Sequence, residues 1–133
     1  MEYISDDYKN NYRNITKENN FDIDRIEQII KADDNEEDLV SVVFGLGRDC
    51  QNQVEFEYAF NHLKNLSKNK SSSVRAFVAL SFSMMIQNGY EIDKKILEPL
   101  ILEIYNKSEE KDIGNVTDAI EEINFFTNWN IKF

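Results

Sequence analysis

The sequence predicts an all-α fold, a short α-solenoid of about three helical hairpins. Helix breakers are scarce, since the 133 residues include one proline and four glycines. Apolar residues recur at steps of three and four in six segments, which is the period of an amphipathic helix. Short polar loops separate these segments, and helices joined by short loops pack as antiparallel neighbours.

Residues 71–88 are predicted to form the central helix of the fold. Three serines at its start supply N-cap hydroxyls, and Gly89 follows at the position where a left-handed residue ends a helix. An apolar stripe runs along the segment, formed by Val74, Phe77, Val78, Phe82 and Met85. Because most of the remaining surface is apolar as well, we expect neighbouring helices on more than one side.

The chain before this helix is expected to be helical too. Residues 1–20 form either a helix that docks by its tyrosines or an N-terminal arm, and the sequence leaves both open. A short helix is predicted at 23–32, capped by Asp22 or Asp24. The next runs from residue 36 or 38 to about 50, and its Gly45 and Gly47 predict close packing of another backbone. A further helix is predicted at 53–67.

Two helices are expected after the central one. The first spans 92–106, where Pro99 predicts either a kink or a helix that begins near Glu98. A loop at 107–112 leads to the last helix at 115–126. Residues 127–133 are expected to close the chain, with Trp129 either capping the core of the last hairpin or anchoring a partner. We expect one α-helical domain over residues 1–133, with the helical repeats at 23–126.

The chain is acidic, with a formal net charge of −10. Residues 1–38 hold twelve acids against five bases, residues 39–90 three against five, and residues 91–133 ten against five. This charge argues against nucleic acid and anionic membranes as partners, and it permits a basic protein. The sequence starts without a signal-peptide pattern and lacks an apolar run of bilayer length, so a cytoplasmic location is expected.

Residues that carry chemistry are isolated from one another. His62, the only histidine, is predicted mid-helix without a companion, and Cys50, the only cysteine, is expected to be a helix-end or core thiol. The acidic segment 32–38 looks like a calcium loop, but Asp38 occupies the glycine slot and Phe44 the closing glutamate slot. Its acids are more simply explained as charges favoured at a helix N-terminus. We therefore expect that the protein is not an enzyme and that it has no catalytic residue, no metal site and no cofactor.

Three segments align as second helices of successive hairpins: DLVSVVFGLG, SVRAFVALSF and NVTDAIEEIN. Each follows another amphipathic helix, which gives units of roughly forty residues. The pattern resembles HEAT repeats, in which the second helix often opens with Val-Arg followed by alanines and a leucine. The matching residues are Val74, Arg75, Ala76, Ala79 and Leu80. The other two units lack the Val-Arg pair. This resemblance, over about 23–126, implies protein binding rather than catalysis.

A small, acidic, helical chain without a catalytic signature is similar to the immunity proteins of bacterial contact-dependent and polymorphic toxin systems. Such proteins neutralise a cognate toxin, often a basic nuclease, with acidic groups that stand in for the phosphates of its substrate. The resemblance implies a cognate basic toxin domain as the partner, bound by a monomer in a 1:1 complex. The alternative is a HEAT-like scaffold or adaptor that binds some other protein.

In a HEAT-like stack the second helices line the concave face. The polar positions expected there are Ser41, Arg48, Asp49, Arg75, Asp118, Glu121 and Glu122. The acidic loops at 33–38 and 109–112 are expected to form its rims. The residues predicted to bind the partner are Trp129 and eight carboxylates: Asp33, Asp34, Glu36, Glu37, Asp38, Asp118, Glu121 and Glu122.

Overall fold

The computed structural model describes residues 21–133. This part of the chain contains six helices. They are α2 (Ile23–Ala32), α3 (Glu36–Arg48), α4 (Gln53–Leu66), α5 (Ser72–Gln87), α6 (Lys94–Asn106) and α7 (Glu110–Thr127). These residues contain no strand, which confirms the all-α prediction. The two alternatives for residues 1–20 lie outside the described residues.

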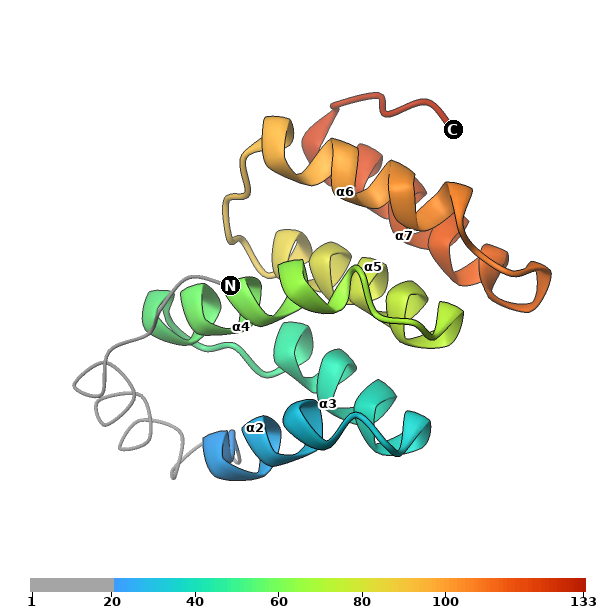
Figure 1. Cartoon of the computed structure of the whole chain (residues 1–133). Helices are drawn as coiled ribbons and strands as arrows, with labels where there is room; N and C mark the ends of the chain where they lie inside the picture. Colours follow the sequence, from blue (N-terminus) through green and yellow to red (C-terminus); the bar gives the residue numbers. More distant parts are fainter. Residues whose placement is uncertain (1–20) are drawn as a thin grey trace.

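The helices pair into three hairpins, α2–α3, α4–α5 and α6–α7, which stack in chain order (Figure 1). Among the described helices, the most extensive packing joins α5 to α3 on one side and to α7 on the other. The second helices of the hairpins therefore form one layer with α5 at its centre, and the first helices form the other. This is a short α-solenoid of three helical hairpins, as predicted.

Side-chain caps fix where most helices begin. The side chain of Asp22 accepts a hydrogen bond from the Arg25 amide at 3.1 Å, which selects Asp22 over Asp24 as the cap of α2. The Ser71 hydroxyl likewise accepts from the Val74 amide at 3.2 Å at the start of α5. Such bonds satisfy amides that have no partner within the helix. Asn35, Asn52 and Asp93 cap α3, α4 and α6 in the same way.

As predicted, α5 is followed by Gly89 in the left-handed conformation. Gly89 has φ +93°, in the left-handed region that favours glycine. Its amide donates to the Ile86 carbonyl at 3.0 Å, and the Tyr90 amide donates to the Met85 carbonyl at 3.0 Å. This pair of bonds is the Schellman arrangement, which satisfies the last carbonyls of a helix.

In the last hairpin one predicted boundary was wrong, and one of two alternatives is excluded. α7 begins at Glu110 rather than at 115, so the second half of the expected loop at 107–112 belongs to the first turn of the helix. The acids at Glu110 and Asp112 suit that turn, because negative charge is favoured at a helix N-terminus. α6 begins at Lys94 and runs through Pro99, so a start near Glu98 is excluded.

α3 and α5 approach each other most closely at Gly47. A Cβ atom placed there would lie 2.6 Å from both the Cα atom and the carbonyl oxygen of Ser81. The Ser81 hydroxyl, buried at the same contact, donates to the Val43 carbonyl of α3. The predicted backbone contact is thus confirmed at Gly47. It was wrong at Gly45, where a Cβ would meet only side-chain atoms of Asp49 and Arg48, the nearer at 3.4 Å.

One hydrophobic core extends through the described residues, from Phe21 to Ile131, with side chains from every helix. Among these helices, none combines the length and the apolar character that crossing a bilayer requires.

Candidate functional site

The predicted acidic loop forms the turn between α2 and α3. Asp33 ends α2 in the left-handed conformation with φ 45°, and Asn35 caps α3. Glu36, Glu37 and Asp38 occupy the first turn of α3, where the helix dipole favours negative charge. All the carboxylates of this loop are exposed except Asp33, which is half-buried.

A cleft of about 190 Å³ separates this loop from the turn between α4 and α5. The Asn69 side-chain amide donates to Asp33 Oδ1 at 3.2 Å, and Lys70 Nζ donates to the Asp33 carbonyl at 3.4 Å. The Ser71 hydroxyl donates to Glu36 Oε1 at 2.7 Å. The structure thus holds the acidic loop against the middle hairpin with neutral donors and one lysine.

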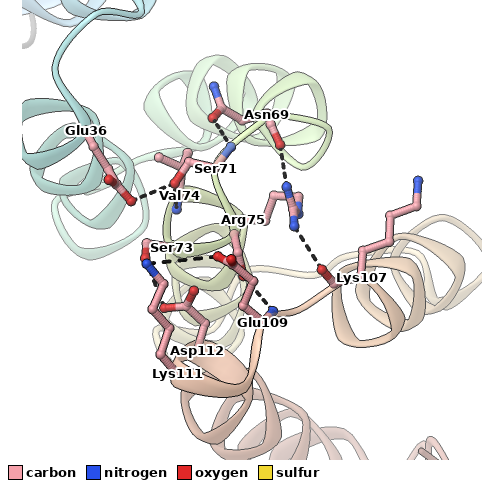
Figure 2. Close-up of polar contacts among 11 residues, drawn as sticks. Glu36, Asn69, Ser71, Ser73, Val74, Arg75, Lys107, Glu109, Lys111 and Asp112 are labelled. Carbon is pink, nitrogen blue, oxygen red and sulfur yellow. Dashed lines mark hydrogen bonds and ion pairs between the residues drawn. The ribbon is translucent and has the colours of Figure 1, made fainter.

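Arg75 extends this line of contacts to the last hairpin (Figure 2). Its Nη1 donates to the Asn69 carbonyl at 2.7 Å, and its Nη2 donates to the Lys107 carbonyl at 3.0 Å. Arg75 therefore ties the α4–α5 and α6–α7 turns together. The prediction that it lines the concave face was wrong, because its position on α5 turns it toward these two turns.

Two further bonds join α5 to the start of α7. The Glu109 amide donates to the Ser72 hydroxyl at 2.9 Å, and the Ser73 hydroxyl donates to Asp112 Oδ1 at 3.0 Å (Figure 2). Glu109 and Glu110 are exposed, as expected for a rim, whereas Asp112 is only 6% exposed. The rim prediction therefore fails at Asp112, whose carboxylate serves the contact between two helices.

The acids predicted on the last helix lie along the open side of α7. Asp118, Glu121 and Glu122 are all exposed. Glu122 Oε2 accepts from the Ser83 hydroxyl at 2.9 Å and from the Gln87 side-chain amide, so it lies beside the second half of α5. This acidic row is separated from the acidic loop at 33–38, because α5 packs between α3 and α7.

Trp129 belongs to a tail that folds back on the last hairpin. Asn124 holds this tail with both side-chain groups: its Nδ2 donates to the Ile131 carbonyl at 2.9 Å, and its Oδ1 accepts from the Ile131 amide at 2.7 Å. Ile131 is buried, and Trp129 packs partly buried against the core. Of the two sequence alternatives, the C-terminal cap fits this packing. The predicted partner-binding residues therefore lie in three separate places.

The two isolated residues, His62 and Cys50, are both buried. His62 lies within α4 with its ring edge-on to that of Tyr58, at 4.7 Å between ring centroids. The Cys50 thiol donates to the Leu46 carbonyl at 2.8 Å. Burial, followed by the charges of Glu55 and Asp49, raises the pKa of this thiol to about 12. A protonated thiol is a poor nucleophile, so Cys50 is a core residue.

Sequence reasoning did not identify an apolar strip on the open side of the second-helix layer. Phe77, Leu80 and Met84 follow one face of α5 at helical spacing and are partly exposed. Phe44 of α3 meets Phe77 edge to face, with ring centroids 6.0 Å apart. In the sequence analysis, Phe44 was considered only because it occupies the glutamate position of a calcium loop. The residues of α5 were assigned to the core. The helical spacing of Phe77, Leu80 and Met84 was the sequence feature that could have revealed the strip.

No cluster of three metal-ligating side chains occurs in residues 21–133. Comparisons of the chain with protein-family models, with curated proteins and with solved structures returned no match. The candidate site is a set of acidic and apolar surfaces on a helical stack.

Proposed function

We propose that this chain is an immunity protein that binds a basic bacterial toxin domain and neutralises it by covering its active site. The resemblance to immunity proteins and the distribution of charge on the stacked hairpins support this function. The binding surface comprises the acidic loop at 33–38 and the acidic row of Asp118, Glu121 and Glu122 on α7.

The observation that carries the proposal is that these carboxylates form no ion pair within residues 21–133. The ion pairs within residues 21–133 use other acids, such as Asp49 with Arg48 and Glu103 with Lys107. None of the eight predicted carboxylates forms an ion pair with a described residue. Exposed charges that are not neutralised within a protein are available to a partner of opposite charge.

Such a surface suits a toxin that acts on a phosphate-containing substrate. The active site of a nuclease is electropositive, because it binds phosphates. Carboxylates that enter it are attracted over the screening length of about 8 Å at physiological ionic strength, which accelerates encounter. A rigid helical stack presents these groups with little loss of conformational entropy on binding.

Co-expression tests this proposal. The tagged chain is isolated from its native host, and the proteins that co-purify are identified by mass spectrometry. We expect a stoichiometric toxin domain of basic composition, whose expression arrests growth alone and is tolerated when this chain is co-expressed. Growth arrest that persists despite co-expression of the wild-type chain with the toxins encoded beside it would contradict the proposal.

The second candidate is a HEAT-like scaffold or adaptor, and the stacked hairpins favour it directly. Helical stacks of this kind present extended faces to other proteins. The same purification separates the two candidates. Recovery of a stable complex without any toxin, together with no protection of growth, supports the scaffold.

A further inference from the structure

We propose that the open face of the α3–α5–α7 layer binds an amphipathic basic helix of a partner protein. The face consists of an apolar strip, formed by Val40, Phe44, Phe77, Leu80 and Met84, and of the acidic row beside it on α7. This inference rests on the proposed function and deepens it, because it specifies which element of the toxin this chain binds.

The apolar strip is a continuous surface across two helices. Phe77, Leu80 and Met84 are spaced by three and four residues, so they share one side of α5. Val40 and Phe44 are spaced by four on α3, and the edge-to-face contact of Phe44 with Phe77 joins the two rows. Phe44 and Met84 are partly exposed and lie outside the core cluster. Met84 therefore retains apolar surface that a partner can bury, whereas the Arg48 guanidinium lies over the Phe44 ring, 5.4 Å from its centroid.

The charges beside the strip select a basic occupant. On the α7 side, Asp118 and Glu122 are exposed, and neither forms an ion pair with a described residue. On the α3 side, Arg48 lies over the Phe44 ring and is paired with Asp49, since its Nε and Nη2 donate to the Asp49 carboxylate at 2.8 and 2.9 Å. Lysine or arginine beside an apolar ridge complements this arrangement.

A helix matches the strip in spacing. Apolar residues at steps of three and four on a partner helix can pack along the row on α5, as in recognition of an amphipathic helix by an apolar surface. A second copy of this chain is a poor occupant, since its net charge of −10 makes self-association repulsive.

The probe is a synthetic amphipathic helix of leucine and lysine, titrated into the full-length ¹⁵N-labelled chain at physiological salt. Two control peptides accompany it: one of leucine and glutamate, and one of the same leucine and lysine content with the leucines spread around the helix. We expect only the amphipathic basic peptide to shift amide resonances around Phe44, Phe77, Met84 and Asp118. Binding of either control peptide with equal affinity, shifts confined to the loop at 33–38, or no shift overturns the proposal.

Variants separate the apolar and the charged contributions. We expect the double variant Phe44→Ser/Met84→Ser to lose roughly ten-fold in affinity, because central apolar contacts carry most of the energy of an interface. Asp118→Lys is expected to lose roughly three- to five-fold, whereas Glu91→Lys, an equal charge change before α6, is expected to lose less than two-fold. Circular dichroism confirms that each variant is folded. Equal losses for Asp118→Lys and Glu91→Lys would show that net charge alone attracts the peptide, which overturns the assigned face.

Failure of this inference is distinguishable from failure of the proposed function. A toxin that the wild-type chain and the Phe44→Ser/Met84→Ser variant neutralise equally leaves the function intact and overturns the face. A wild-type chain that protects against no toxin removes the function, whatever the peptide titration shows.

Discussion

At the scale of single residues, Gly47 sets the distance between α3 and α5. The absent side chain lets the backbone of α5 approach at Ser81, and the Ser81 hydroxyl bonds the Val43 carbonyl across the same contact. Gly45, two residues earlier, has no such neighbour. The two glycines share a helix and differ in what surrounds them, so they form a matched pair.

We predict that Gly47→Ala destabilises the protein by about 1–3 kcal/mol, because the new methyl group forces the two backbones apart. Gly45→Ala is expected to be neutral or to stabilise by up to about 1 kcal/mol, since alanine favours the helix and its methyl group would meet only side-chain atoms at ordinary contact distance. Urea unfolding followed by circular dichroism measures both. Equal stability of Gly47→Ala and the wild type would show that the helices are not in close contact there.

The buried Cys50 thiol predicts a pH dependence of stability. Its pKa is raised to about 12 in the folded chain, against about 8.5 for an exposed thiol in the unfolded chain. The contribution of the neutral thiol to the free energy of unfolding is fully present below the pKa of the unfolded chain. It is lost as the pH rises toward the pKa of the folded chain. Between these values the wild type is expected to lose up to about 1.4 kcal/mol per pH unit more than Cys50→Ser. Parallel pH profiles for the two proteins, measured by urea unfolding, would contradict the raised pKa.

At the scale of elements, Arg75 joins the turns of neighbouring hairpins. We predict that Arg75→Ala destabilises the chain by about 2 kcal/mol, because two hydrogen bonds from a charged group to carbonyls are lost. Lys107→Ala keeps the carbonyl acceptor and removes only an exposed side-chain ion pair with Glu103, so it should cost no more than about 0.5 kcal/mol. Hydrogen exchange is expected to accelerate at both turns in Arg75→Ala only. Unchanged exchange there would remove this role for Arg75.

Helix boundaries were predictable where a cap residue marks them. Asp22 and Ser71 are such residues, and each accepts the expected bond. The start of α7 was not predictable in this way, because Glu109 makes no side-chain cap bond and the amide of Glu109 is satisfied instead by Ser72 of another helix. A tertiary contact replaces the local signal, so the polar sequence around it indicated a loop.

At the scale of the whole molecule, the apolar period predicted the stack of hairpins but not the orientation of each polar residue within it. Arg75 was expected on the concave face, and it points to the turns because that side of α5 meets the first-helix layer. Phe44 and Met84 were not recognised as surface residues, since spacing alone does not tell a face that packs from one that stays open. The acidic loop and the acidic row were expected to border one surface, but α5 packs between α3 and α7 and separates them.

The central claim is that exposed carboxylates without an ion-pair partner among the described residues attract a basic toxin domain. Its most direct test is the association rate constant of the purified chain with the toxin domain that co-purifies with it, measured by stopped flow over a range of salt concentrations. For the wild type we predict a rate constant that falls steeply with salt. For Asp118→Lys/Glu121→Lys we predict one about ten-fold lower at low salt and less dependent on salt. A rate constant unaffected by salt and by this charge reversal would contradict the claim.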